Sequence, residues 1–153
     1  MNRLEPGQLW VMRVHATIFA LVVAIAAIVV ETGFASRLGL PRGLVAALVL
    51  PFIVYIVFIS PGRHYRAWLY AMDADDLRLS RGVWTQVHTI VPLDRVQHID
   101  VSQGPIERGF GVCRLVVHTA GTQYSRVVVP GLSRPNAERM RDEIRARIVR
   151  EAE

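Results

Sequence analysis

A short segment, residues 92–112, carries most of the side chains whose types could do chemistry. Its sequence is PLDRVQHIDVSQGPIERGFGV, and its ionisable or nucleophilic members include Asp94, His98, Asp100, Ser102 and Glu107. Histidine and carboxylate groups serve as general acids and bases, and a serine hydroxyl attacks a substrate once a base activates it. The segment therefore raises an enzyme hypothesis, in which His98 would work with Asp100 and Arg95.

Strand geometry weakens this hypothesis. Residues 95–101 alternate in character as a strand does, and a strand turns neighbouring side chains to opposite faces. One face would hold Gln97, Ile99 and Val101, and the other would hold Val96, His98 and Asp100. A His-Asp pair without a positioned nucleophile is not a catalytic triad, so we expect no enzyme. We expect instead a buried, mutually bonded polar group made of Arg95, Gln97, His98 and Asp100.

The glycines at 109–111 suggest a phosphate loop, but the pattern is incomplete. Arg114 stands where a dinucleotide fingerprint needs its third glycine, and a strand is expected to follow instead of a helix. We therefore expect a tight turn that anchors Phe110 in the core, and we expect no cofactor.

Metal binding is also disfavoured. His88, His98 and His118 fall on three different expected strands, with no short spacing that would force them together. Cross-strand hydrogen bonds are the favoured use of these histidines. Cys113 alternates with Leu115 and Val117, which is typical of a small core residue.

Two long apolar runs favour membrane helices. Residues 14–30 read VHATIFALVVAIAAIVV and residues 44–59 read LVAALVLPFIVYIVFI, and neither run contains a charged side chain. Backbone N–H and C=O groups cannot be left without hydrogen-bond partners in lipid, so we expect helical spans over about 10–30 and 44–60. A proline such as Pro51 is tolerated inside a membrane-spanning helix. The alternatives are a cleavable signal peptide and a hairpin in the core of a soluble protein. The second apolar run close behind the first disfavours the signal peptide, and the lack of a polar stripe on either run disfavours the soluble hairpin.

The arginines around the two runs predict an orientation. A Gly- and Pro-containing turn at 31–43 makes the spans a hairpin; four arginines flank the hairpin outside and two lie in the turn. This bias favours a bacterial inner-membrane protein with both termini in the cytoplasm. The residues expected at the lipid interface are Arg13, Arg63, Arg66 and Trp68.

The remaining chain, 64–153, reads as short strands followed by one helix. Turn signals at 73–76, 80–82 and 120–121 separate alternating runs, which favours an antiparallel barrel or sandwich. After Ser133, a candidate N-cap, apolar side chains recur at helical spacing at Ala137, Met140, Ile144 and Ile148. Thirteen arginines face eleven acids in this part, so no nucleic-acid groove is expected.

With this order of elements, the chain resembles the membrane-flanked bacterial pleckstrin-homology-like domain family. The resemblance rests on VPLDRVQHIDV at 91–101, QGPIER at 103–108, FGV at 110–112 and HTAG at 118–121. The motif residues, expected to be structural, are Pro92, Arg95, Gln97, His98, Asp100, Gly104, Arg108, Gly111, Thr119 and Gly121.

The resemblance implies an α+β membrane protein: a hairpin over 1–63, then a PH-like split β-barrel of about seven strands over 64–153, capped by the C-terminal helix. The family has no established reaction, so we expect an interaction or assembly module. Its expected partners are membrane lipids and either another membrane protein with similar domains or a second copy. A lipid-binding module is the alternative, although three acids within 73–76 would repel phosphate where many PH domains bind it.

Overall fold

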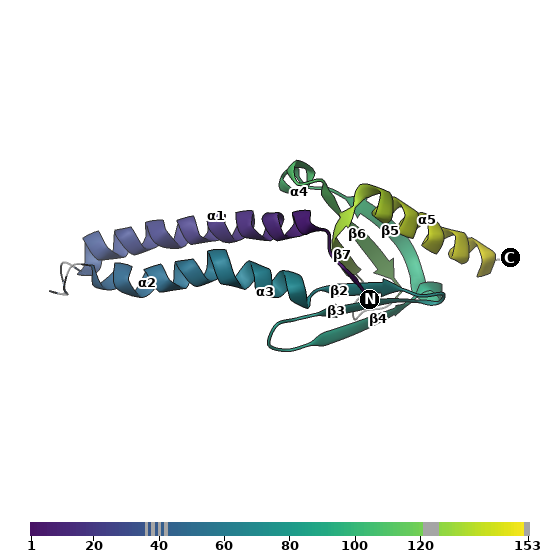
Figure 1. Cartoon of the computed structure of the whole chain (residues 1–153), viewed down its shortest axis with the longest axis horizontal. Coiled ribbons are helices and arrows are strands. Elements are labelled where there is room, and N and C mark those ends of the chain that lie inside the picture. The colour runs from purple at the N-terminus through teal and green to yellow at the C-terminus, as the bar shows by residue number, and fades with distance from the viewer. Residues whose placement is uncertain (36, 38, 40, 42, 121–125, 152–153) are drawn as a thin grey trace. The chain divides into compact units, whose positions relative to one another are not determined.

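The computed structural model describes residues 1–35, 37, 39, 41, 43–120 and 126–151, which form two compact units. One unit contains Met1–Val11 together with His64–Glu153, and it is called the PH-like unit below. The other unit, Met12–Arg63, is called the hairpin unit. Figure 1 labels the helices and strands of both.

Two helices have the length and composition needed to cross a membrane. They cover Pro6–Gly33 and Leu44–Ala67, with 28 and 24 residues, and include both predicted spans. The first is α1 (Pro6–Val30) with a π-helical turn at Glu31–Ala35; the second comprises α2 (Leu44–Val54), a π-helical turn at Tyr55–Ile59 and α3 (Ser60–Ala67). Pro51 lies inside α2, and the π-helical turn that follows is a usual way to accommodate the missing backbone donor.

Glu31 connects the two helices within the hairpin unit. Its carboxylate accepts hydrogen bonds from the backbone N–H of Gly43 at 2.5 Å and of Val45 at 3.1 Å. These two groups lie at the start of α2, where N–H groups lack helical partners and the helix dipole favours an anion. The one acid of the turn therefore has a structural use.

The first sheet of the PH-like unit has the order β1-β2-β3-β4, and all its neighbours are antiparallel. Its strands are β1 (Asn2–Arg3), β2 (Leu69–Met72), β3 (Asp76–Arg81) and β4 (Val87–Pro92). Gly82 follows β3 at φ 113° and a side chain there would collide with the Thr85 carbonyl oxygen, so the predicted glycine turn is confirmed. Leu77 and Leu79 of β3 point into the core.

The second sheet has the order β5-β6-β7, also antiparallel. Its strands are β5 (Val96–Ser102), β6 (Val112–Thr119) and β7 (Arg126–Ser133), and a short helix α4 (Pro105–Gly109) joins β5 to β6. Valine is the most frequent residue in β6 and in β7, as expected for strands packed on a core. No strand pairing joins the two sheets among the described residues, so the strands are split as expected, while a closed barrel is not shown.

Helix α5 (Arg134–Glu151) packs against the second sheet, as Figure 1 shows. It begins directly after Ser133, the predicted cap position. Ala137, Met140 and Ile144 are all buried, which confirms the predicted apolar face. Leu115 of β6 and Val129 of β7, two strands on which α5 packs, are fully buried as well.

The amino-terminal residues Met1–Val11 belong to the PH-like unit, whereas residues 1–63 were all predicted to form the hairpin. Asn2 and Arg3 pair with Tyr70 and Leu69 in the first sheet. The Tyr65 hydroxyl donates to the Leu4 carbonyl at 2.8 Å. The backbone N–H of Glu5 donates to the carbonyl of Gly131 at 2.8 Å. The segment before the first span is thus held to the segment after the second span.

Candidate functional site

The histidines of the motif form a polar cluster on the outward face of the second sheet. His98 lies opposite His118, and both imidazoles approach the carboxylate of Asp100, with Nε2 to oxygen distances of 2.9 Å and 3.5 Å. The side chains of His98, Asp100 and His118 are 69%, 50% and 38% exposed. The mutual bonding predicted for His98 and Asp100 is confirmed, but their predicted burial is wrong.

A β-bulge explains the error. The register runs from Val96 opposite Thr119 to His98 opposite His118, so Gln97 is an extra residue in β5. The bulge breaks the expected alternation: Val96 points into the core while His98 and Asp100 point out. Gln97 and Arg95 are exposed as well, so the predicted buried polar group does not exist.

This cluster has little of what a catalytic site needs. Ser102 lies further along the same outward face, is exposed, and makes no side-chain hydrogen bond within the described part of the chain. The described residues also contain no group of three or more His, Cys, Asp or Glu side chains placed to hold a metal ion. His88 lies on β4, in the other sheet, away from the pairing of His98 with His118.

The strongest polar contacts in the motif segment belong to Glu107, which is 3% exposed. Its carboxylate accepts hydrogen bonds from the backbone N–H of Gly104 at 2.7 Å and from Nε of Arg114 at 2.9 Å, and Nη2 of Arg114 lies 2.6 Å away in the same ion pair. The first bond caps α4, and the others tie α4 to β6. In the sequence Glu107 was considered only as a possible acid or base. A Glu three residues after a cap position, here Gly104, with Pro105 as the first helical residue, is nevertheless a signal for the start of a helix.

The glycine turn after α4 does not bury Phe110, contrary to the prediction. Phe110 is 38% exposed, and Gly111 has φ 67°, a conformation that favours glycine. Cys113, two residues later, is 1% exposed, which confirms its place in the core. Burial raises the pKa of the Cys113 thiol, and the nearby Glu107 carboxylate raises this pKa further.

The other motif residues mark the ends of strands. Pro92 is the last residue of β4, and Arg95 ends a 3-10 turn (Leu93–Arg95) that leads into β5. The carbonyl of Arg95 accepts from the N–H of Ala120 at 2.9 Å, next to Thr119 at the end of β6. Gly121 lies outside the described residues. Pro92, Arg95 and Thr119 thus lie at junctions between elements.

The four residues expected at the lipid interface occupy different surroundings. Arg13 lies in α1, while Arg63 and Arg66 lie in α3 with exposed side chains. Trp68 lies between α3 and β2, and the guanidinium of Arg81 stands 5.8 Å from its ring centroid. This distance is within the range of a cation–π contact, so Trp68 has a partner inside the PH-like unit.

The acidic turn falls between β2 and β3, and arginines offset its charge. Arg78 lies 3.4 Å from Asp73 and 3.5 Å from Asp76, and Arg147 of α5 lies 3.4 Å from Asp75. Asp75 is 93% exposed, so the turn still presents negative charge to solvent. The arrangement does not favour a phosphate ligand at this turn.

Two apolar helices, two antiparallel sheets and a closing helix define the class: a transmembrane-type chain that carries a PH-like domain. A family comparison agrees, because the bacterial PH domain family matches residues 12–148. The chain therefore belongs to the bacterial PH domain family.

Two proteins of Bacillus subtilis (strain 168) are similar to the chain. The UPF0699 transmembrane protein YdbS is 30% identical over 146 residues, covering 94% of this chain and 89% of that protein. The UPF0699 transmembrane protein YdbT is 25% identical over 81 residues, covering 52% of this chain but 16% of that protein. No solved structure matches the chain.

Proposed function

We propose that the chain is a non-enzymatic protein of the bacterial inner membrane whose PH-like unit acts as an assembly module. The unit would dock a PH-like domain of another membrane protein along the β4 edge. One observation carries the proposal: large apolar side chains are exposed beside a strand edge that has no partner strand among the described residues.

The β4 edge has the features of a docking strand. Within the described sheet β4 pairs only with β3, so one side of its backbone is open to hydrogen bonds from another strand. Ile90 on its outward side is 61% exposed, and Trp84 in the turn before it is 82% exposed. Large apolar and aromatic side chains at such exposure are typical anchors of protein interfaces.

The proposed occupant is a domain of the same family. Bacillus subtilis has two transmembrane proteins that match this chain, one over nearly its whole length and one over a small share of a longer protein. Related domains on different membrane proteins offer matching strand edges in the same compartment. Confinement to a membrane raises their effective concentration, so a modest edge-to-edge contact can suffice.

The topology of the PH-like unit supports an even number of membrane crossings. Asn2 precedes the first candidate span and pairs with Tyr70, which follows the second, and this pairing supports a topology with both ends on one side. The arginine bias favours the cytoplasm as that side.

Affinity purification of the tagged full chain from native membranes tests the proposal. We expect a membrane protein with a PH-like domain to co-purify, and Ile90→Glu to abolish its recovery. Arg145→Ala is the matched control, because it lowers the net charge by one as Ile90→Glu does, at an exposed position on α5. Equal recovery with both variants contradicts the proposed edge, and recovery of the chain's own second copy alone contradicts the proposed occupant.

A membrane-surface lipid module is the second candidate, favoured by the exposed arginines of α3. Arg63 and Arg66 stand at the end of the second candidate span and can attract anionic headgroups. This candidate predicts that Arg63→Ala with Arg66→Ala weakens the preference of the reconstituted full chain for phosphatidylglycerol over phosphatidylcholine. An unchanged lipid preference would rule it out.

A further inference from the structure

A polar cavity of about 290 Å³ opens in the PH-like unit between the start of β6 and the first turns of α5. Its lining contains Val101, Gln103, Arg108, Cys113, Arg134, Glu138 and Arg141. The cavity is separate from the β4 edge and from the acidic turn at 73–76. Its volume is at the lower end of small-molecule sites, which suits a small group and excludes a large ligand.

We propose that this cavity binds a singly charged phosphate group, such as the phosphodiester of a phospholipid headgroup or a free phosphate. Three guanidinium groups face one carboxylate in the lining, and they come from two elements, α4 and α5. Guanidinium groups bind phosphate oxygens through paired N–H donors.

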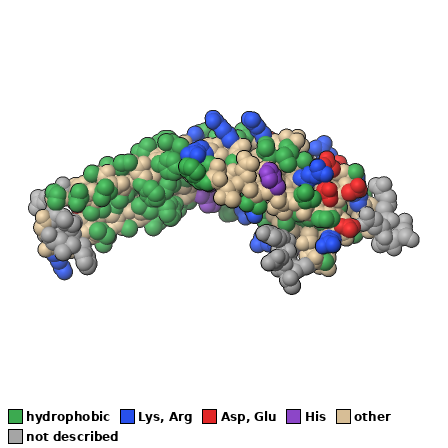
Figure 2. Space-filling model, turned by 90° about the horizontal axis from the view of Figure 1, so that it is seen from below, with side chains coloured by type: hydrophobic (Ala, Val, Ile, Leu, Met, Phe, Trp, Pro, Cys, Tyr) green, Lys and Arg blue, Asp and Glu red, His purple; other side chains and the backbone are tan. Residues whose placement is uncertain are grey.

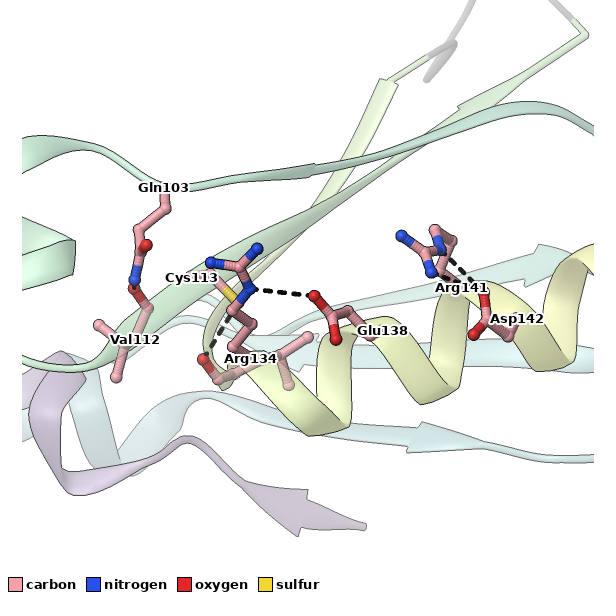
Figure 3. Close-up of polar contacts among 8 residues, drawn as sticks. Gln103, Val112, Cys113, Arg134, Glu138, Arg141 and Asp142 are labelled. Carbon is pink, nitrogen blue, oxygen red and sulfur yellow. Dashed lines mark hydrogen bonds and ion pairs between the residues drawn. The ribbon is translucent and has the colours of Figure 1, made fainter.

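The arginines of α5 keep unused donors. Arg134 binds Glu138 through Nε at 3.0 Å. Arg141 binds Asp142 through Nε and Nη2, at 2.9 Å and 2.8 Å. The terminal nitrogens of Arg134 and Nη1 of Arg141 have no protein partner within the described part of the chain. Figure 3 shows the side chains of Arg134, Glu138 and Arg141 projecting from the same side of α5.

Arg108 supplies the uncompensated charge. Its side chain has no hydrogen bond or ion pair with any described residue, whereas Glu138 offsets Arg134 and Asp142 offsets Arg141. One positive charge in excess is therefore left at the cavity, which matches a monoanion better than a dianion.

The wall opposite α5 is held in place. Gln103 donates through Nε2 to the carbonyl of Val112 at 2.9 Å, and the thiol of Cys113 contacts the carbonyl of Leu132 at 3.4 Å. Figure 3 shows Gln103, Val112 and Cys113. Donors that approach from α4 and from α5 need acceptor oxygens in several directions. A tetrahedral phosphate provides them, and a planar carboxylate does not.

The experiment uses the full chain with three variants of the same type. Arg108→Gln and Arg134→Gln remove cavity donors, and Arg145→Gln removes an exposed arginine of α5 outside the cavity. Both cavity arginines have exposed side chains, so these substitutions should leave the fold intact, which circular dichroism checks.

Two arms separate the possible sources of the phosphate. In the first, inorganic phosphate is titrated into detergent-solubilised protein at constant ionic strength, and the unfolding temperature is followed. In the second, native mass spectrometry compares retention of phosphatidylglycerol with that of a phosphate-free galactolipid. A site for free phosphate gives a rise in unfolding temperature in the first arm, and a headgroup site gives selective retention in the second.

In either case we expect Arg108→Gln and Arg134→Gln each to weaken binding about tenfold, the loss expected for one charge-assisted hydrogen bond, and Arg145→Gln to have no effect. If neither ligand distinguishes the cavity variants from Arg145→Gln, the proposal is wrong.

Discussion

Replacing the buried Glu107 by Gln should destabilise the PH-like unit more than the same change from a carboxylate to an amide at an exposed position. The carboxylate is almost completely buried, accepts hydrogen bonds from the Gly104 N–H and from Nε of Arg114, and forms an ion pair with the same guanidinium. An amide of the same shape has one oxygen and one NH₂ group, so it must turn a donor toward either Gly104 or Arg114.

The size of the effect follows from the exposure of the partners. A hydrogen bond to a charged group contributes about 1.5 to 3 kcal/mol, and at least one is lost. The Arg114 side chain is 41% exposed, so water can replace part of the hydrogen bonding that Arg114 loses. We therefore expect the free energy of unfolding to fall by about 2 to 3 kcal/mol. For a domain of this size, that loss lowers the unfolding temperature by roughly 10 °C or more.

Tryptophan fluorescence suits the assay, because Trp10, Trp68 and Trp84 all lie in the PH-like unit. The full chain in mild detergent would be heated, with Glu143→Gln as the control at an exposed position on α5. The control should shift the unfolding temperature by no more than a few degrees. If Glu107→Gln matches the control, the buried ion pair does not hold α4 to β6 as we describe.

Three further predictions concern the core and the amino-terminal segment. Gly131 has φ 64°, and a Cβ added there would lie 2.6 Å from Cβ of Gln8. Gly131→Ala should therefore lower the free energy of unfolding by about 2 kcal/mol or more, measured by the same thermal assay. Gly109→Ala is the control, because a Cβ added at Gly109 meets nothing within 4 Å. Burial raises the pKa of the Cys113 thiol above 9.0 and that of Tyr70 above 10.0. The folded chain therefore keeps both protons to higher pH than the unfolded chain, so this contribution to stability is complete below the ordinary values of 9.0 and 10.0 and is lost as pH rises past them. Iodoacetamide should accordingly modify Cys113 far more slowly in the folded chain than in denaturant, and equal rates would contradict its burial.

The sequence predicted the elements whose signals are local and repeated. The helical spacing of Ala137, Met140 and Ile144 identified the buried face of α5, and the two apolar runs identified the long helices. The glycine turn at Gly82 was also recognisable, because only a residue without Cβ fits beside Thr85.

The errors arose where tertiary structure overrides alternation. The bulge at Gln97 turns His98 and Asp100 to the outward face of the sheet, although Val96 points into the core. A bulge depends on the partner strand and not on residues 95–101 alone. Strand β1 has two residues and forms only because Tyr70 and Leu69 offer an edge, so no periodicity could reveal it. Phe110 is exposed because α4, which was not expected, sets the direction of the following turn.

The cavity arginines were visible in the sequence but not as a group. Arg108 and Arg134 are separated by two strands, and only the packing of α5 on the second sheet brings them to one opening. Arg134 and Arg141 are seven residues apart in α5, about two helical turns, so the helical period places them on the same side of the helix. A shared face alone does not indicate a binding site.

Site-specific photo-cross-linking from β4 in native membranes tests the central claim most directly. A photoreactive amino acid would replace Ile90, and a control chain would carry it at Ser102, an exposed position on β5 in the other sheet. We predict that position 90 forms cross-links to the PH-like domain of another membrane protein and that position 102 does not. Cross-links from position 90 to lipid alone, or equal products from both positions, would contradict the assembly role.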